Sequence, residues 1–254
     1  MLSVFSTLKE TFVLWSKHFR FLVIVTLIVG TISGFLTSGY FLSDDPKVLN
    51  PLLRALLLFI GQLVGLVFSA MSVTAILGFL SGLSVGRQGL ASASESIKAN
   101  TWTLFRLFIL LGLIAVPFML VFALMGPLLG FGSVLIVIMV SLELVFLKYA
   151  LAYPLVVVEK LRARSALRRS WGMTKGYFWY VAGCYIFLGA GEWVVDWAMS
   201  LPLGNTNSSP GWIGIVVGFA SNLIDTLWTV QSWVMYLRLK EVEVARVAAT
   251  VSPA

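Results

Sequence analysis

Five ionisable side chains interrupt otherwise apolar stretches of this 254-residue chain, and their chemistry needs an explanation. A charged group costs about 2.5 to 3.5 kcal/mol at the centre of a membrane helix, so such residues commonly mark ion paths or polar contacts. Two of them, Glu192 and Asp196, are four residues apart and share one helix face. The complete set is Glu143, Lys148, Glu192, Asp196 and Asp225.

Three interpretations of these residues are open. The acids could form a structural clasp with nearby polar residues such as Asn222 and Thr226. They could instead dock a polar group of a partner inside the membrane, or form steps of a proton or cation pathway. Glu143 and Lys148, five residues apart, do not share a helix face well enough to predict an ion pair.

A second candidate site is a basic segment between two apolar runs. It could bind an anionic lipid headgroup or an acidic partner, each charge contributing about 1 kcal/mol near an anionic leaflet, or serve only to fix topology. We expect a short surface helix here, with Ser165 as its N-cap and Gly176 as its stop, and a kink at Pro154 before it. The basic residues are Lys160, Arg162, Arg164, Arg168, Arg169 and Lys175.

The elements that must position these groups are six apolar runs. Each has the roughly 20 residues that cross a bilayer core, and the composition, 59% hydrophobic and 11% charged, is that of a membrane protein. The predicted fold class is all-α, a polytopic membrane helical bundle with short cytoplasmic interfacial helices, in one transmembrane domain spanning residues 1–254. The predicted spans are residues 21–40, 52–83, 104–124, 134–158, 178–201 and 212–237.

The basic residues also predict the orientation of the chain. All but two of its 18 Lys and Arg residues lie in four segments: the N-terminus, the connections after the second and fourth runs, and the C-terminal tail. The exceptions are Lys47 and Arg54. Because positively charged loops stay in the cytoplasm, we expect both termini to be cytoplasmic and the first run to be a retained helix.

Three cytoplasmic segments have a similar pattern of Ser or Thr, basic residues and a Trp directly before an outward span. We therefore hypothesise three repeated hairpins around a pseudo-threefold axis, each preceded by an interfacial helix. The alternative is that any juxtamembrane helix has this composition. The segments are Ser6–Trp15, Ser92–Trp102 and Ser165–Trp171.

The motifs of soluble enzymes are missing from the sequence. One histidine, His18, and one cysteine, Cys184, exclude a His/Cys metal centre and an intramolecular disulfide, and no phosphate-binding loop motif occurs. Asp196 and Asp225 lack the Gly-rich surroundings of an intramembrane aspartyl enzyme. We expect no catalysis, no metal and no cofactor. Nucleic acid is not an expected partner, because the basic residues lie beside spans.

Within the basic segment and the run before it, the chain resembles a known family. Residues 154–159, Ala166, Leu167, Ser170 and 174–176 are similar to the signature of the membrane domain found with bacterial glycerophosphoryl diester phosphodiesterases and related uncharacterised six-span proteins. The resemblance covers residues 80–185. It implies a six-helix module of the bacterial inner (plasma) membrane without chemistry of its own, since the activity in that family belongs to a separate soluble barrel.

These observations predict a non-catalytic integral membrane protein, acting as an accessory or assembly subunit of a membrane complex or as a lipid-binding scaffold. Its expected partners are anionic membrane lipids and other membrane protein subunits. One alternative is a small transporter or channel that uses the intramembrane acids. Another, by family analogy alone, is an activity on a lipid phosphodiester.

Overall fold

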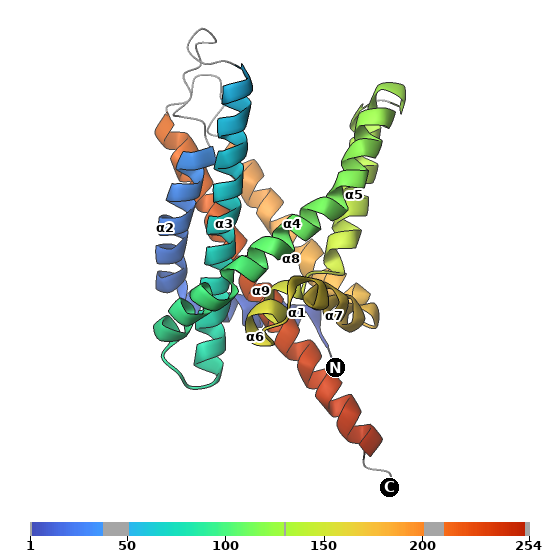
Figure 1. The fold of residues 1–254 in the computed structure, drawn as a ribbon. Coiled ribbons are helices and arrows are strands. Elements are labelled where there is room, and N and C mark those ends of the chain that lie inside the picture. Colours follow the sequence, from blue (N-terminus) through green and yellow to red (C-terminus); the bar gives the residue numbers. More distant parts are fainter. Residues whose placement is uncertain (1, 38–50, 130, 201–210, 252–254) are drawn as a thin grey trace.

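The computed structural model describes residues 2–37, 51–129, 131–200 and 211–251, and all regular structure within them is helical (Figure 1). The prediction of an all-helical protein is therefore confirmed for the described residues. The helices are α1 (Val4–Lys17), α2 (Phe19–Thr37), α3 (Pro51–Ser84), α4 (Gly89–Leu129), α5 (Phe131–Leu147), α6 (Ala152–Val158), α7 (Ala163–Lys175), α8 (Phe178–Ser200) and α9 (Gly211–Val251).

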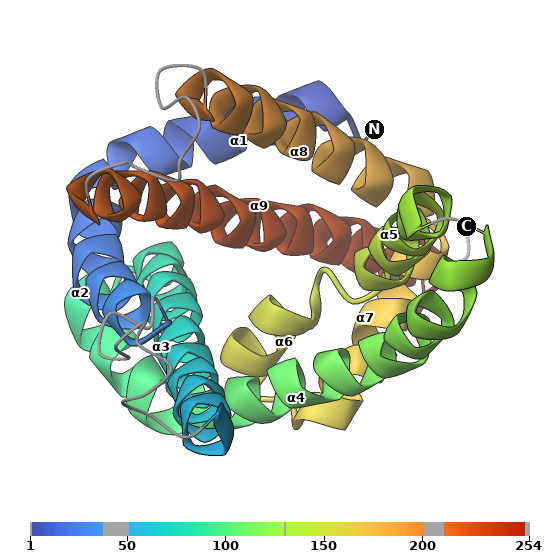
Figure 2. The same ribbon diagram turned by 90° about the horizontal axis from the view of Figure 1, so that it is seen from above.

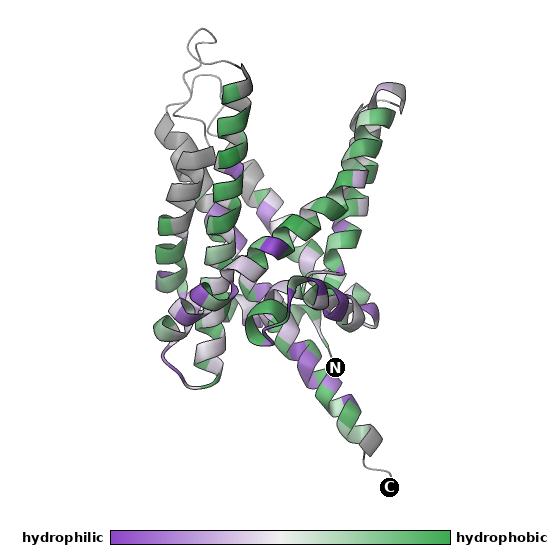
Figure 3. Cartoon of the chain, in the orientation of Figure 1, coloured by the Kyte–Doolittle hydropathy of each residue, from purple (hydrophilic) through white to green (hydrophobic). Residues whose placement is uncertain are grey.

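Three helical stretches are long and apolar enough to cross a membrane: Phe59–Ser84, Gly89–Met125 and Val140–Val158. The pair Val4–Lys17 and Phe19–Ile28, bent by 74°, adds a fourth stretch if it is one span. Figure 3 shows mainly hydrophobic residues along α3, α4 and α5, and hydrophilic residues on α7 and the tail of α9. The chain is thus a helical protein with several helices able to span a bilayer, and the count of six spans is not confirmed.

The first helix, α1, is amphipathic in the sense suited to a membrane surface. Thr7 and Thr11 are buried against the protein, whereas Phe5, Phe12 and Val13 are exposed. Ser6 and Lys9 are exposed on the same side. A helix whose outer side mixes large apolar and basic side chains suits the interfacial plane of a bilayer. The turn at His18 then redirects the chain by 74° into α2, so α1 crosses the end of that helix.

Small residues allow α3 and α4 to pack closely. A Cβ on Gly78 would overlap the Cβ of Ser96, and one on Gly82 would overlap that of Ser92. The two glycines are four residues apart on α3, and the two serines are four residues apart on α4. Each pair therefore lies on one helix face, as in the small-residue contacts common between membrane helices. Serine and glycine at these positions therefore bring the backbones of α3 and α4 together.

The second segment of the proposed repeat differs from the other two. Residues 92–102 do not form a separate interfacial helix, because α4 continues without a break from Gly89 to Leu129. The first and third segments are separate helices, α1 and α7, each followed by a turn. The threefold arrangement is not confirmed and stays a prediction.

The predicted span 134–158 is interrupted, and not where the sequence suggested. The helix breaks at residues 148–151, between α5 and α6, upstream of Pro154. Pro154 lies in the first turn of α6, where a proline is tolerated because its missing N–H would have no helical partner. The short α6 is almost entirely buried, and it belongs to the main core together with the middle of α9.

Viewed from above, most helices form a ring that α9 crosses, with α6 inside it (Figure 2). The outer parts of α4 and α5 diverge from α2 and α3 (Figure 1). Their own small cluster, centred on Ile138 and Leu142, is separate from the main core. We call this outer part of α4 and α5, residues 113–125 and 137–146, the α4–α5 arm.

Candidate functional site

The helix α7 presents two chemically different faces. Its buried residues Ala163, Ala166, Ser170 and Thr174 recur every three or four positions and form one inward stripe. The predicted end of this helix at Gly176 is confirmed, but the predicted N-cap is wrong. The helix begins two residues before Ser165, with Arg162 at the N-cap position and no side-chain capping bond.

The inward residues of α7 form hydrogen bonds with the helix break at residues 148–151. The Ser170 hydroxyl donates to the Lys148 carbonyl at 2.9 Å, and its oxygen accepts from the Leu151 amide at 3.2 Å. The Thr174 hydroxyl lies 3.2 Å from the Lys148 carbonyl and shares its single proton between this carbonyl and that of Ser170, at 3.0 Å. Backbone groups released by a broken helix are costly when buried without partners, so these two side chains supply what α5 and α6 lack.

The outward face carries a surface that we call the α7 basic surface. Arg169 forms an ion pair with Glu243 of α9 at 2.6 Å, and among the described residues it is the only one of the six with such a partner. Lys160 has a left-handed backbone, φ 52°, in the turn before α7. All six side chains are exposed. The surface consists of Lys160, Arg162, Arg164, Arg168, Arg169 and Lys175.

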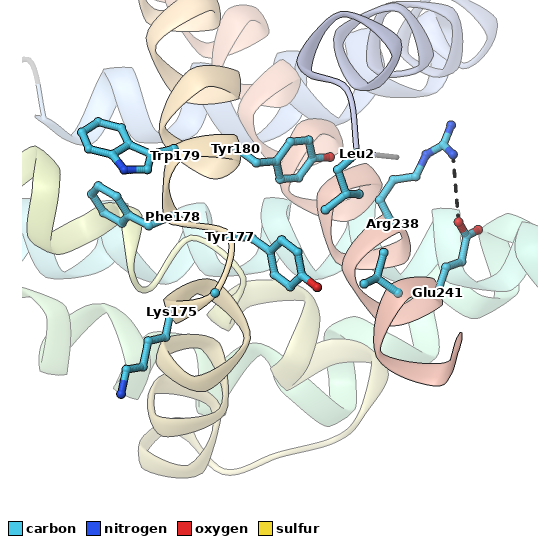
Figure 4. A pocket seen from close by; sticks show the side chains of 10 residues that line it. Leu2, Lys175, Tyr177, Phe178, Trp179, Tyr180, Arg238 and Glu241 are labelled. Atoms are coloured by element: carbon cyan, nitrogen blue, oxygen red, sulfur yellow. Dashed lines mark ion pairs between the residues drawn. The ribbon is translucent and has the colours of Figure 1, made fainter. Parts of the chain in front are cut away.

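A cavity of about 700 Å³ lies where α7, α8 and the tail of α9 meet, next to this surface (Figure 4). Lys175, Tyr177 and Trp179 line it, and the Trp179 side chain is 82% exposed. Arg238, on the α9 wall, donates to Glu10 of α1 from two nitrogens, at 2.7 and 3.0 Å. A basic and aromatic lining of this kind suits the boundary between lipid headgroups and acyl chains.

A second polar group joins the end of α6 to α9. The Tyr236 hydroxyl donates to Glu159 at 3.0 Å and accepts from the Lys240 ammonium at 2.9 Å. Lys240 also lies 3.8 Å from the Glu159 carboxylate. The hydrogen bond to Tyr236 is the main cause that raises the pKa of Lys240 above its ordinary value. This group therefore fixes the tail of α9 with a charged lysine at neutral pH.

The predicted intramembrane charges have different surroundings. Glu143 is exposed on α5. Lys148 lies at the helix break, with its ammonium 4.1 Å from the centre of the Trp171 ring, a cation–π distance. Glu192 accepts a hydrogen bond from Trp228 Nε1 at 2.7 Å, which links α8 to α9.

Of the remaining two acids, the structure describes the side chain of Asp225 alone. The side chain of Asp196 lies outside the described residues. Asp225 lines a cavity with Asn222 and Thr226, and Glu192 is not part of that lining. Thr226 itself donates to the Leu223 carbonyl and accepts from Trp15 Nε1. The functional roles of these acids stay predictions.

Sequence reasoning missed the ion pairs that hold α9. Arg238 and Glu10 are 228 positions apart, and no local spacing could have paired them. The Tyr236–Lys240 contact was accessible in principle, because residues four apart share a helix face. Within the described parts of the chain, no three His, Cys, Asp or Glu side chains gather as metal ligands would.

Comparison of the chain with models of protein families, with curated proteins and with solved structures gave no match. The resemblance of residues 154–176 to the membrane domain of the phosphodiesterase family therefore stays a prediction.

Proposed function

We propose that this protein is a non-catalytic, six-span protein of the bacterial inner membrane that binds anionic lipid headgroups on its cytoplasmic face and serves as a scaffold there. The exposed apolar side chains of the long helices support the membrane placement. The concentration of Lys and Arg in the terminal segments and in the connections after the second and fourth apolar runs supports a cytoplasmic position for both termini. The family resemblance of α6 and α7 also supports a six-span module without its own chemistry.

The observation that carries the lipid proposal is the α7 basic surface. Five of its six cations have no ion-pair partner among the described residues, and one helix and its preceding turn present all six outward. Trp171 and Trp179 are exposed beside them, as expected for side chains at headgroup depth. Cations without an acidic partner keep their charge available for an anionic headgroup.

The test is lipid retention by the purified protein, measured by native mass spectrometry from nanodiscs that contain phosphatidylglycerol and phosphatidylcholine. The variant Arg162→Gln/Arg164→Gln/Arg168→Gln removes three charges of the α7 basic surface. At about 1 kcal/mol for each charge, we expect it to lower the retention of phosphatidylglycerol tenfold or more.

The control variant makes the same charge change elsewhere, in other exposed basic residues: Lys9→Gln/Arg87→Gln/Lys98→Gln. We expect it to retain most of the phosphatidylglycerol. Equal retention by both variants and the unmodified protein would contradict the proposal.

The α4–α5 arm favours a second candidate function, that of an accessory subunit. Leu113, Leu120 and Leu124 of α4 and Val137 of α5 are all exposed, and the arm packs mainly on itself. A partner's membrane helix could cover this surface. If so, the protein purified in mild detergent should carry a stoichiometric membrane protein, and Leu120→Trp should release it while Ile24→Trp on the exposed side of α2 should not.

A further inference from the structure

A separate cavity, of about 330 Å³, lies between α2, α3 and α9. Figure 2 shows these three helices side by side at one edge of the ring. Phe108 of α4 and Tyr153 of α6 add aromatic rings to its wall, with ring centres 5.6 Å apart. This volume exceeds that of one water, about 30 Å³ in the liquid, and falls within the range of small-molecule sites.

The lining is polar although the helices around it are apolar. On α9 the contributing residues Asn222, Asp225 and Thr229 recur every three or four positions, so one face of the helix is turned to the cavity. Ser69 and Ser72 line it from α3. Polar groups inside a membrane protein are costly, and a concentration of them around a cavity therefore points to an occupant.

Thr26 on α2 gives independent support for an occupant. Its side chain lines the cavity, is 2% exposed, and has no hydrogen-bond partner for Oγ1 among the described residues. A helical threonine ordinarily donates to the carbonyl four residues before it, as Thr11 does to Thr7 and Thr74 does to Ala70, both at 2.9 Å. The Thr26 hydroxyl, in contrast, is left for a ligand.

The charge of the lining selects the class of ligand. Asp225 is its one carboxylate, and no Lys or Arg belongs to the described lining. The field in the cavity therefore favours a cation. A bare metal ion needs far less room, whereas an organic cation can place its ammonium group near Asp225 and against an aromatic face of Phe108 or Tyr153.

We propose that this cavity binds a small organic cation that carries an alkylammonium group. The Asp225 carboxylate supplies the negative charge, and the aromatic rings supply cation–π contact. The Thr26 hydroxyl forms a hydrogen bond with the polar part of the ligand. The site is distinct from the α7 basic surface in place and in sign, and it stands whether or not anionic lipids bind there.

The test is binding of choline chloride to the full chain in detergent, by isothermal titration calorimetry, with sodium chloride as the matched salt. We expect saturable choline binding that weakens tenfold or more in Asp225→Asn. The matched control is Glu192→Gln, which neutralises an intramembrane acid outside this lining and should leave choline affinity unchanged.

A second variant keeps the test informative if Asp225→Asn fails to fold. Thr26→Val removes the unpartnered hydroxyl while keeping the side-chain shape. It should weaken choline binding at least threefold and yet raise the unfolding temperature of the ligand-free protein, because a buried unsatisfied group is lost. A substitution that only damaged the fold would lower both the affinity for choline and the unfolding temperature.

Three results would overturn the proposal: no saturable choline binding, equal binding by Asp225→Asn, or the same response to sodium chloride alone. Competition by phosphatidylethanolamine in nanodiscs distinguishes the source of the ammonium group. If this lipid displaces choline, the natural ligand is a lipid headgroup, and if it does not, the ligand is a free cation. Both of these results support the ammonium site.

Discussion

The hydroxyl of Ser170 on α7 donates to the backbone carbonyl of Lys148 at 2.9 Å, at the point where the helix running through α5 breaks. The same oxygen accepts from the amide of Leu151 at 3.2 Å. The Ser170 side chain thus forms hydrogen bonds with backbone groups on both sides of the break. These bonds link α7 to the interior of the protein. This contact is one of those that position the α7 basic surface, together with the buried residues Ala163 and Ala166.

Replacing Ser170 by alanine should destabilise the protein by about 1 to 3 kcal/mol, because the buried amide of Leu151 and the part-buried carbonyl of Lys148 lose a partner. The measurement is the free energy of unfolding in detergent. Ser165→Ala is the matched control, since Ser165 is exposed and caps nothing. It should change stability by less than about 0.5 kcal/mol. Similar losses in the two variants would show that the helix break does not need Ser170.

Replacing Gly78 by leucine should separate α3 from α4, because a Cβ at this position would overlap the side chain of Ser96. We expect the protein to unfold at a markedly lower temperature or to be degraded in cells. Gly112→Leu is the control on α4, where an added Cβ meets nothing within 4 Å. That variant should be as stable as the original, or more so, because leucine favours helix.

Replacing Gln231 by methionine should leave stability unchanged or raise it by about 1 to 3 kcal/mol, the cost of a buried polar group without a partner. Gln231 is fully buried, and neither of its amide atoms has a partner among the described residues. In contrast, Asn100→Leu should destabilise, since Asn100 donates to Ser96 at 3.2 Å. A loss of stability in Gln231→Met would indicate a partner at this amide. Thermal unfolding of the two variants measures the difference.

The His18 imidazole at the turn between α1 and α2 should make stability depend on pH. Burial, with a smaller effect of Lys17, lowers the pKa of His18 below its ordinary 6.5 in the folded protein. The folded state therefore prefers neutral imidazole. Stability should be full above pH 6.5 and decline as the pH falls from 6.5 through the folded-state pKa. The unfolding temperature of His18→Gln should fall less over this range, and identical curves would contradict the assignment.

Orientation in the membrane can be tested with thiol labels, since the only cysteine is Cys184. In a Cys184→Ala background, Lys47→Cys should react with an impermeant maleimide in spheroplasts, and Gln88→Cys should not until the membrane is opened. The physical reason is the exclusion of basic segments from translocation. Labelling of Gln88→Cys in intact spheroplasts would contradict the proposed topology, because it would place residue 88 outside the cytoplasm.

The main helices could be predicted because bilayer thickness sets a length of about 20 apolar residues, and long apolar runs therefore match helices. Residues 52–83 became α3 (Pro51–Ser84), and residues 178–201 became α8 (Phe178–Ser200). The end of α7 at Gly176 could also be predicted, because helix stops are local signals. The basic surface was visible as a cluster of charges in the sequence.

The amino-acid sequence by itself therefore determined the helical class, the apolar runs and the position of the basic segment, since these depend on local composition. Only the tertiary structure decided the break at residues 148–151, the partner of Arg238 and the cavity beside Thr26. The reason is physical: a break is tolerated only where another helix satisfies its backbone groups, and a cavity exists only where several helices leave space between them. Both depend on residues far apart in the chain.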